Sequence, residues 1–288
     1  MIAVGEPAVT SALATRVATG IALVAAALAA LFLLPPAGWG IVALLVVVGA
    51  AREWARLAGL TGAPGILFAG VVLAAGAALL WTAADGEWPR TLVLVVCGLA
   101  TLFWLALGTP SVLLRWLPAS PIARAAIGWV VLLGAFVAVV SLQARSPWLV
   151  LCAMAIVWIA DTAAYFTGRR FGRRKLAPQV SPGKTWEGAC GGIAAVVVYA
   201  LALLPFAARA GLAPLDGAFV ARWILLAIAL GALSIVGDLY ESLLKRRAGV
   251  KDSGTLLPGH GGILDRTDAL LAAMPPAALA AAFLLAGP

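Results

Sequence analysis

Charged residues are scarce in this chain. Only 11% of its 288 residues are Asp, Glu, Lys or Arg, whereas 64% are hydrophobic and the mean hydropathy is +1.06. A soluble domain of this length carries far more polar surface, so the composition excludes an ordinary globular protein. It favours a multi-pass membrane protein, for which the bilayer is the solvent.

Cysteine is equally rare. The three cysteines, Cys97, Cys152 and Cys190, all lie in apolar stretches and are far apart in the sequence. Neither a disulfide framework nor a zinc site is therefore indicated, because both need cysteines at short, repeated spacings or in polar loops. We interpret the three as small core residues.

Long apolar runs separated by short polar breaks predict an all-α polytopic integral membrane protein with about nine transmembrane helices. The second run is short enough that a re-entrant segment is an alternative, and Pro275 and Pro276 should kink the ninth. The predicted spans are Val17–Leu34, Trp39–Ala51, Gly65–Trp81, Thr91–Gly108, Ala125–Gln143, Pro147–Thr167, Gly188–Ala208, Trp223–Leu244 and Ala269–Ala286.

The distribution of basic residues predicts the orientation of these spans. Of the 20 Lys and Arg residues, sixteen fall before the first span or after an even-numbered one, and four fall on the other face. The positive-inside rule then places the N-terminus in the cytoplasm and the C-terminus outside. The net charge of +8 is thus one-sided, which suits anionic lipid headgroups and phosphates and makes nucleic acid an unnecessary inference.

The polar peculiarities divide the chain into two regions. Residues 1–145 hold few charges within spans and are interpreted as an N-terminal transmembrane scaffold of five spans. Residues 146–288 hold nearly all the unusual polar features and are interpreted as the catalytic region, with cytoplasmic loops at 168–187 and 245–267. Functional residues are therefore expected in the second half.

The most unusual segment is Ser242–Asp268, which carries five basic residues, three carboxylates and the only histidine. Asp238, Ser242 and Lys245 follow at i, i+4 and i+7, so they line one stripe of a helix. A helical ion pair between Glu241 and Lys245 would explain part of this pattern but not Asp238, because an ionised group near lipid must be paired or hydrated.

Asp265 and Asp268 stand at the start of the ninth span, and two interpretations are open. They could cap the helix and complement its dipole. Alternatively, together with Asp238 on the preceding helix, they could hold divalent cations such as Mg²⁺, whose preferred ligands are oxygens. Two such cations would clamp a triphosphate, although the second need not be divalent.

Glycine and basic residues supply the other half of a phosphate site. The run Pro258-Gly-His260-Gly261-Gly262 allows close backbone approach and offers N–H groups to an anion ahead of a helix. His260 could act as a general acid or a metal ligand, but a hydrogen bond to a phosphate is the plainer role. Basic residues around it are typical of phosphoryl and nucleotidyl transfer sites, and they are Lys245, Arg246, Arg247, Lys251 and Arg266.

A second charged cluster runs from Gly168 to Gly188. Its basic residues, Lys175 among them, suit an ordinary cytoplasmic loop, but the run Ser-Pro-Gly-Lys184-Thr-Trp-Glu-Gly is not explained in this way. Gly-Lys-Thr is part of a nucleotide-binding P-loop, yet the upstream glycine is missing and no strand is expected before it, so a P-loop is excluded. Asp161, near the end of the sixth span, is either a structural ion-pair partner or a ligand or metal contact facing a hydrated cavity.

These residues resemble the CDP-diacylglycerol synthase (phosphatidate cytidylyltransferase) family. The family signature has a Ser, a Lys-Arg pair, a Lys-Asp pair, a His-Gly-Gly and an Asp-Arg-x-Asp. Its equivalents here are Ser242, Lys245-Arg246, Lys251-Asp252, His260-Gly261-Gly262 and Asp265-Arg266-Thr267-Asp268. The segment from Asp161 to Gly188 resembles a second sequence block of the family. The resemblance covers residues 150–275 well, and the earlier spans only by hydropathy.

The resemblance implies transfer of a cytidylyl group from CTP to phosphatidate, giving CDP-diacylglycerol and pyrophosphate in phospholipid biosynthesis. By this resemblance, Asp238, Asp265 and Asp268 would hold catalytic Mg²⁺ cations, and Lys245 and Arg266 would also be catalytic. The residues expected to bind CTP or the lipid phosphate are Lys184, Ser242, Arg246, Lys251, His260, Gly261, Gly262, Asp161 and Lys175. The expected setting is the cytoplasmic face of the inner membrane, with membrane lipid as partner and a homodimer as an option.

Two alternatives stay open at this point. A CTP-dependent lipid kinase would need similar carboxylates and basic loops but would transfer a terminal phosphoryl group. An ion or small-molecule transporter would use intramembrane carboxylates such as Asp161 and Asp238. It predicts paired broken helices near the middle of the bilayer, whereas these charges cluster at one predicted face.

Overall fold

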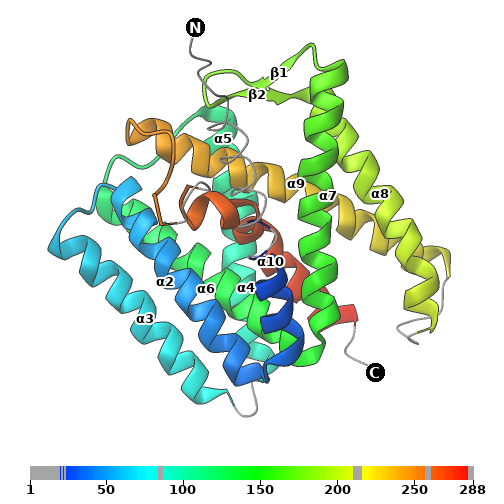
Figure 1. Cartoon of the computed structure of the whole chain (residues 1–288), viewed down its shortest axis with the longest axis horizontal. Helices are drawn as coiled ribbons and strands as arrows, with labels where there is room; N and C mark the ends of the chain where they lie inside the picture. The colour runs from blue at the N-terminus through cyan, green and yellow to red at the C-terminus, as the bar shows by residue number, and fades with distance from the viewer. Residues whose placement is uncertain are drawn as a thin grey trace, which may run out of the picture.

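The computed structural model of the chain describes residues 20, 22, 24–83, 87–209, 216–256 and 261–284. Within this part, long helices make up most of the molecule (Figure 1). They are α2 (Pro36–Leu57), α3 (Ala63–Thr82), α4 (Arg90–Phe103), η1 (Trp104–Gly108), α5 (Thr109–Leu114), α6 (Pro121–Arg145), α7 (Pro147–Phe171), α8 (Trp186–Arg209), α9 (Gly217–Arg247) and α10 (Leu264–Leu284).

The prediction of a helical, multi-pass membrane protein is confirmed. Six helical segments in the described part are long and apolar enough to cross a bilayer. Five of them contain a predicted span in full, and the sixth, Trp186–Phe206, covers all but the last two residues of the predicted span Gly188–Ala208. They are Ala63–Thr82, Arg90–Leu114, Pro121–Arg145, Pro147–Phe171, Trp186–Phe206 and Gly217–Arg247. The number of spans beyond these six and their direction stay predictions.

The other three predicted spans also fall on helices or beside them. Helix α2 runs without interruption through the segment 39–51 and measures about 33 Å at 1.5 Å per residue, close to the thickness of a bilayer. Helix α10 continues through Pro275 and Pro276. A short apolar helix, Val24–Leu33, occupies part of the first predicted span, whose beginning lies largely outside the described residues.

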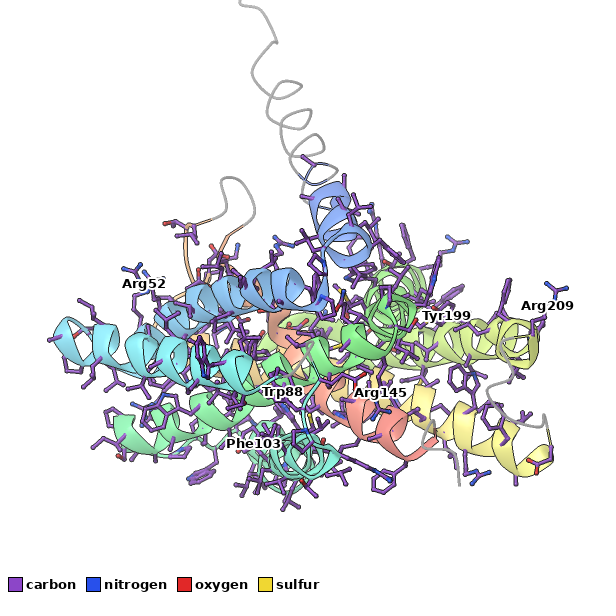
Figure 2. The ribbon with its side chains drawn as sticks, turned by 90° about the horizontal axis from the view of Figure 1, so that it is seen from below. Arg52, Trp88, Phe103, Arg145, Tyr199 and Arg209 are labelled. Carbon is purple, nitrogen blue, oxygen red and sulfur yellow. The ribbon has the colours of Figure 1, made fainter. Side chains whose placement is uncertain are left out.

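Helix α6 forms the centre of the bundle. It is the most buried of the six candidate spans, with 67% of its most apolar stretch inside the protein. It packs against α2, α4, α7 and α10, while α7 lies along α8 and α9 lies along α10. Helix α10 therefore runs through the middle of the molecule (Figure 1). Figure 2 shows Arg52 on α2 and Arg209 at the end of α8 pointing outwards at opposite sides.

A short β-hairpin corrects the prediction of a loop at 168–187. Helix α7 extends to Phe171, and the chain then forms strands β1 (Lys175–Ala177) and β2 (Ser181–Thr185), which pair antiparallel before α8 begins at Trp186. The predicted loop at 245–267 is likewise shorter, because α9 continues to Arg247 and α10 begins at Leu264. The expectation that no strand precedes Gly-Lys-Thr was also wrong, since β1 precedes it and these three residues themselves lie within β2.

Candidate functional site

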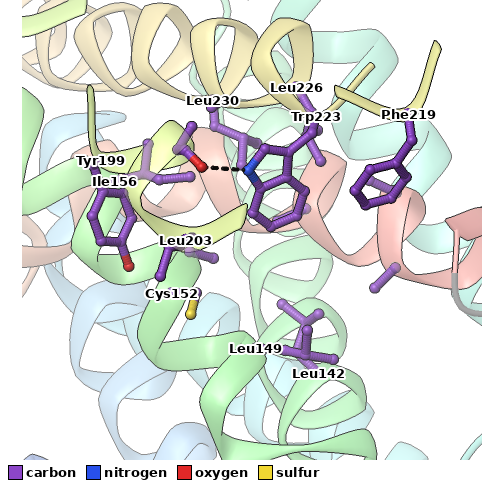
Figure 3. Close-up of a pocket in the computed structure, with 16 residues that line it drawn as sticks. Leu142, Leu149, Cys152, Ile156, Tyr199, Leu203, Phe219, Trp223, Leu226 and Leu230 are labelled. Carbon is purple, nitrogen blue, oxygen red and sulfur yellow. Dashed lines mark hydrogen bonds between the residues drawn. The ribbon is translucent and has the colours of Figure 1, made fainter. Parts of the chain in front are cut away.

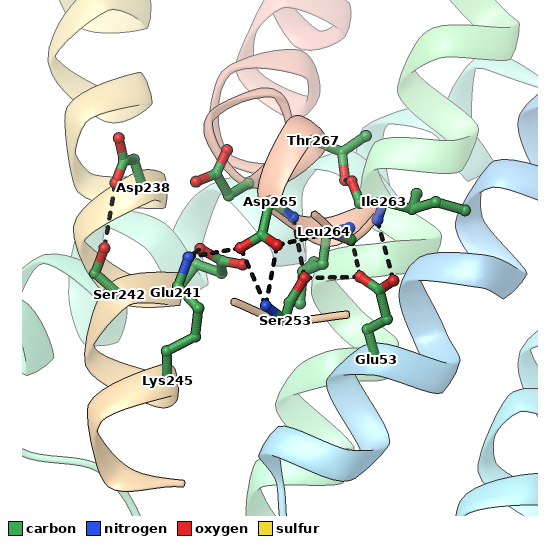
Figure 4. A network of polar contacts seen from close by, with 12 residues as sticks. Glu53, Asp238, Glu241, Ser242, Lys245, Ser253, Ile263, Leu264, Asp265 and Thr267 are labelled. Carbon is green, nitrogen blue, oxygen red and sulfur yellow. Dashed lines mark hydrogen bonds and ion pairs between the residues drawn. The ribbon is translucent and has the colours of Figure 1, made fainter. Parts of the chain in front are cut away.

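The end of α9 carries the stripe of polar residues that the sequence predicts. Ser242 Oγ donates to Asp238 Oδ1 over 3.3 Å, one helical turn away. Lys245 forms the predicted ion pair with Glu241 and a second ion pair, of 2.7 Å, with Asp265 Oδ1 on α10 (Figure 4). The α9 stripe is thus joined directly to the start of the next helix.

Asp265 is held from several sides. Besides Lys245, its carboxylate accepts hydrogen bonds from the backbone N–H of Ser253, at 3.0 and 3.2 Å, and from that of Gly262, at 2.8 Å. Burial raises the pKa of this carboxyl, which precedes the predicted ninth span, but the bonds from Lys245 and Gly262 outweigh burial and lower the pKa to about 2. Asp265 is therefore an anchored anion.

The capping interpretation of Asp265 is partly right. Its side chain reaches back three residues to the N–H of Gly262, which is the acidic half of a capping box. This contact also uses the Gly262 N–H, which the sequence interpretation had assigned to a phosphate. The neighbouring Gly261 has a positive φ of 82°, a conformation that glycine adopts at little cost.

Lys184 connects the two charged sequence blocks. It extends from β2 to Asp238 on α9, and its Nζ lies 2.6 Å from Asp238 Oδ2. Both side chains are partly exposed, at 24% and 30%, so the pair is accessible from outside the bundle. The hairpin thus places the ammonium group of Lys184 beside the carboxylate of Asp238, the first residue of the α9 stripe.

Two further carboxylates lie within electrostatic reach of this pair. Asp161 on α7 interacts with the charges of Lys184 and Asp238, and Asp268 on α10 interacts with Asp238, Glu241 and Lys184. Gly237 makes the approach of α9 to α10 possible, because a Cβ there would lie 2.5 Å from the carbonyl oxygen of Asp268. Helices α7, α9 and α10 therefore bring carboxylates to one region.

The remaining predicted residues surround this region less directly. Arg246 donates from Nε to the carbonyl oxygen of Val180 over 3.2 Å, which ties α9 to the hairpin turn. Lys175, Lys251 and Arg266 are exposed. His260 lies outside the described residues, so its predicted role is not described by the structure.

The structure does not bring the three predicted metal ligands together as one set. Among the described residues, no group of three or more His, Cys, Asp or Glu side chains is arranged to hold a metal ion. Both carboxylate oxygens of Asp265 already accept hydrogen bonds. Asp238 and Asp268, with Asp161 nearby, nevertheless offer the oxygen donors that Mg²⁺ prefers, and their like charges favour a cation between them. These residues match the chemistry of a divalent-cation site, but among the described residues they do not form a coordination set.

Sequence reasoning missed Glu53 on α2. This side chain is only 5% exposed, and its carboxylate contacts the segment around Ser253 and the first residues of α10 (Figure 4). In the sequence it stands between Arg52 and Arg56, a pattern typical of a solvated helix end. The one signal that could have revealed it is its place directly after a long apolar run.

An apolar cavity of about 100 Å³ lies along the same helices (Figure 3). Side chains from α6 to α10 line it, including Cys152, Tyr199, Trp223 and Leu230. The indole of Trp223 donates to the carbonyl oxygen of Ala200 over 2.9 Å, so this polar group is satisfied within the wall. The cavity can accept hydrocarbon but offers little to a charged group.

Comparison with known proteins agrees with this chemistry. The model of the cytidylyltransferase family matches residues 14–284. The phosphatidate cytidylyltransferase of Pseudomonas aeruginosa is 39% identical over 272 residues, which cover 90% of this chain and 93% of that protein.

Shorter matches fall on two other relatives that carry the same name. The protein of Haemophilus influenzae is 49% identical over 127 residues, or 44% of this chain and 43% of its own length. That of Brucella suis is 50% identical over 121 residues, 41% of either chain. These two alignments span less than half of the relatives' lengths, whereas the Pseudomonas alignment is nearly complete. The chain therefore belongs to the cytidylyltransferase family and is a homologue of the phosphatidate cytidylyltransferases.

Proposed function

We propose that this protein is a phosphatidate cytidylyltransferase, a nucleotidyltransferase that converts CTP and phosphatidate into CDP-diacylglycerol and pyrophosphate. The observation that carries the proposal is the 2.6 Å ion pair between Lys184 and Asp238. It joins the two charged sequence blocks into one site, in a chain that is similar to such an enzyme over nine-tenths of its length.

In this reaction an oxygen of the phosphatidate phosphate attacks the α-phosphorus of CTP. The bond between the α-phosphorus and the bridging oxygen to the β-phosphate breaks, and pyrophosphate leaves with the bonding electrons. The attacking phosphate is already an anion, so the site needs no strong general base. It must instead bring two negatively charged substrates together and neutralise them, which preorganised cations do effectively.

Basic residues from both blocks divide this task. Lys184 stands beside Asp238 and Lys245 beside Asp265, each with a carboxylate that fixes the position of its ammonium group. Lys175 in β1, Lys251 after α9 and Arg266 in the first turn of α10 are also exposed. Together with Arg246 and His260, these residues bind the triphosphate and the lipid phosphate, and Ser242 and Gly261 line the approach.

Mg²⁺ is the proposed cofactor, with Asp238, Asp265 and Asp268 as its candidate ligands. Asp238, whose side chain is 30% exposed, is accessible to a cation, whereas both oxygens of Asp265 already accept hydrogen bonds from Lys245, Ser253 and Gly262. When bound, two cations, of which the second need not be divalent, would neutralise the phosphates and the departing pyrophosphate. Asp161 orients Lys184 or a cation.

The lipid substrate enters from the membrane. The apolar cavity of Figure 3 lies along α7, α9 and α10, the helices that carry the carboxylates, so an acyl chain can extend towards it while the phosphate stays among the basic residues. We place the site at the cytoplasmic face of the inner membrane, with the N-terminus inside and the C-terminus outside. The homodimer stays a prediction that light scattering of the detergent-solubilised protein can measure.

The proposal is tested with purified protein in detergent, CTP, phosphatidate and Mg²⁺. We expect a CDP-lipid and an equal amount of pyrophosphate, and we expect EDTA to abolish both products until Mg²⁺ is restored. If neither pyrophosphate nor a CDP-lipid forms, the proposed function is wrong. Formation of CDP together with a newly phosphorylated lipid would support the CTP-dependent lipid kinase instead, and uptake of a solute by reconstituted vesicles without turnover would support a transporter.

A further inference from the structure

Helix α2, in the half of the chain predicted to be scaffold, inserts a buried carboxylate beneath the start of α10. Glu53 Oε2 accepts from Ser253 Oγ and from the backbone N–H of Leu264, each over 2.8 Å. Its Oε1 accepts from the backbone N–H of Ile263 over 3.1 Å. The first N–H groups of a helix have no partners within the helix and carry partial positive charge, so this anion satisfies them and stabilises that end of α10.

Ser253 transmits this contact to Asp265. Ser253 is 3% exposed, and its Oγ, while donating to Glu53, accepts from the backbone N–H of Asp265 over 3.2 Å. In return, the backbone N–H of Ser253 donates to the Asp265 carboxylate. Figure 4 shows the resulting chain of contacts from Glu53 through Ser253 to Asp265 and on to Lys245.

Arg56, one turn after Glu53 on α2, also contacts Ser253. One of its terminal guanidinium nitrogens donates to the carbonyl oxygen of Ser253 over 2.5 Å. Ser253 is therefore fixed through its hydroxyl, its N–H and its carbonyl oxygen. The two contacts from α2 set the position of the segment that faces Asp265.

The backbone closes tightly around the Glu53 carboxylate. A Cβ on Gly254 would lie 2.2 Å from Glu53 Oε1, and one on Gly262 would lie 2.3 Å from Glu53 Oε2. One turn earlier on α2, Gly49 packs against Ile263, since a Cβ there would lie 2.4 Å from Ile263 Cδ1. Two glycines thus make room for this carboxylate, and any shift of Glu53 displaces the start of α10.

We infer that Glu53 is a positioning residue of the cytidylyl-transfer site. It does not touch the substrates. Through Ser253 and the first turn of α10 it fixes the Asp265 carboxylate, and Asp265 in turn fixes Lys245. This inference rests on the proposed function, because it concerns the geometry in which that reaction occurs, and it extends the site into the N-terminal half of the chain.

The first test compares Glu53→Gln with wild type. Glutamine keeps the size of the side chain, but its amide nitrogen cannot accept a hydrogen bond, so at least one of the three donors loses its acceptor. A displacement of about 1 Å in a transfer site costs on the order of 100-fold in rate. We therefore expect kcat to fall about 100-fold while KM for CTP changes less than about threefold, measured well below the unfolding temperature of each variant.

Two arginines of α2 supply a matched pair that leaves the buried carboxylate intact. Arg56 and Arg52 are both exposed, but only Arg56 reaches Ser253, and Arg52 makes no hydrogen bond or ion pair with the described residues. Arg56→Gln should lower kcat about tenfold with KM unchanged, by the same argument from displacement. Arg52→Gln should match wild type. This pair decides the question even if Glu53→Gln fails to fold.

A double-variant cycle separates positioning from simple stabilisation. If Glu53 acts through Ser253, Glu53→Gln combined with Ser253→Ala loses no more kcat than the worse single variant. Losses that multiply, or single variants with a lower unfolding temperature and wild-type kcat, would overturn the inference. A wild-type protein that forms no CDP-lipid would instead overturn the proposed function, so the two failures are distinguishable.

Discussion

Lys245 on α9 and Asp265 on α10 lie 2.7 Å apart, Nζ to Oδ1, and so join the end of one helix to the beginning of the next. The same ammonium group also pairs with Glu241, whose side chain is 3% exposed. Lys245 is therefore held between two carboxylates, and the cation that faces the site is fixed before any substrate arrives. Such preorganisation is the main means by which a protein stabilises charge in a transition state.

Replacing Asp265 by Asn should nearly abolish turnover. The amide keeps the shape of the side chain but loses the charge that holds Lys245 and half of the acceptors for Ser253 and Gly262. We expect kcat to fall on the order of 1,000-fold with the protein still folded and inserted in the membrane. Product formation and gel filtration in detergent measure the two properties. Near-normal activity would reduce Asp265 to a helix cap.

Replacing Lys184 by Gln should lower activity and change the response to Mg²⁺. The substitution removes the ammonium group that neutralises Asp238 and acts on Asp161 and Asp268. We expect a loss of about 100-fold in kcat. The half-saturating Mg²⁺ concentration should fall, because a divalent cation then meets less competition for these carboxylates.

Arg170 provides the control for Lys184. It is also basic and exposed, at the end of α7, and it forms no hydrogen bond or ion pair with the described residues. Arg170→Gln should leave both the rate and the Mg²⁺ response unchanged. A higher Mg²⁺ requirement in Lys184→Gln than in wild type would contradict the proposed competition.

Adding a methyl group to Gly262 should destabilise the protein. The new Cβ would lie 2.2 Å from Ser253 Oγ, a distance that no relaxed structure accommodates. We expect Gly262→Ala to cost about 1–3 kcal/mol of unfolding free energy and to lower activity with it. Gly183→Ala, in β2 with open space around it, should stay within about 0.5 kcal/mol of wild type. Thermal unfolding in detergent measures both, and equal stability of the two variants would speak against the tight packing.

The predicted orientation can be tested by labelling single cysteines in a variant without the three native ones. Arg173, beside the hairpin, and Glu87, before α4, are both exposed and lie on opposite predicted faces. On intact cells a membrane-impermeant maleimide should label Glu87→Cys and spare Arg173→Cys until the cells are permeabilised. The reverse pattern would place the site outside the cytoplasm.

The sequence predicted the helices well because hydropathy alone specifies an apolar segment of bilayer length. The predicted span Pro147–Thr167 and helix α7, Pro147–Phe171, begin at the same residue. The hairpin was missed because strands of three and five residues, rich in Lys, Pro and Gly, leave no periodic pattern.

Within the site, the sequence predicted which residues take part better than it predicted which residues contact one another. Local helical spacing predicted the pair of Glu241 with Lys245, since residues four apart share a helix face. It could not predict that Asp265 would be fully engaged by neighbours instead of joining Asp238. Glu53 was missed because its partner Ser253 lies 200 residues later, a contact that only the tertiary fold creates.

The central claim is that the cytidylyl group, with the α-phosphate of CTP, is transferred to the lipid. Purified protein given phosphatidate, Mg²⁺ and CTP labelled with ³²P at either the α- or the γ-phosphate tests this claim directly. The account predicts label in the lipid from α-labelled CTP, and from γ-labelled CTP label only in pyrophosphate. Label in the lipid from γ-labelled CTP, with none from α-labelled CTP, would contradict it.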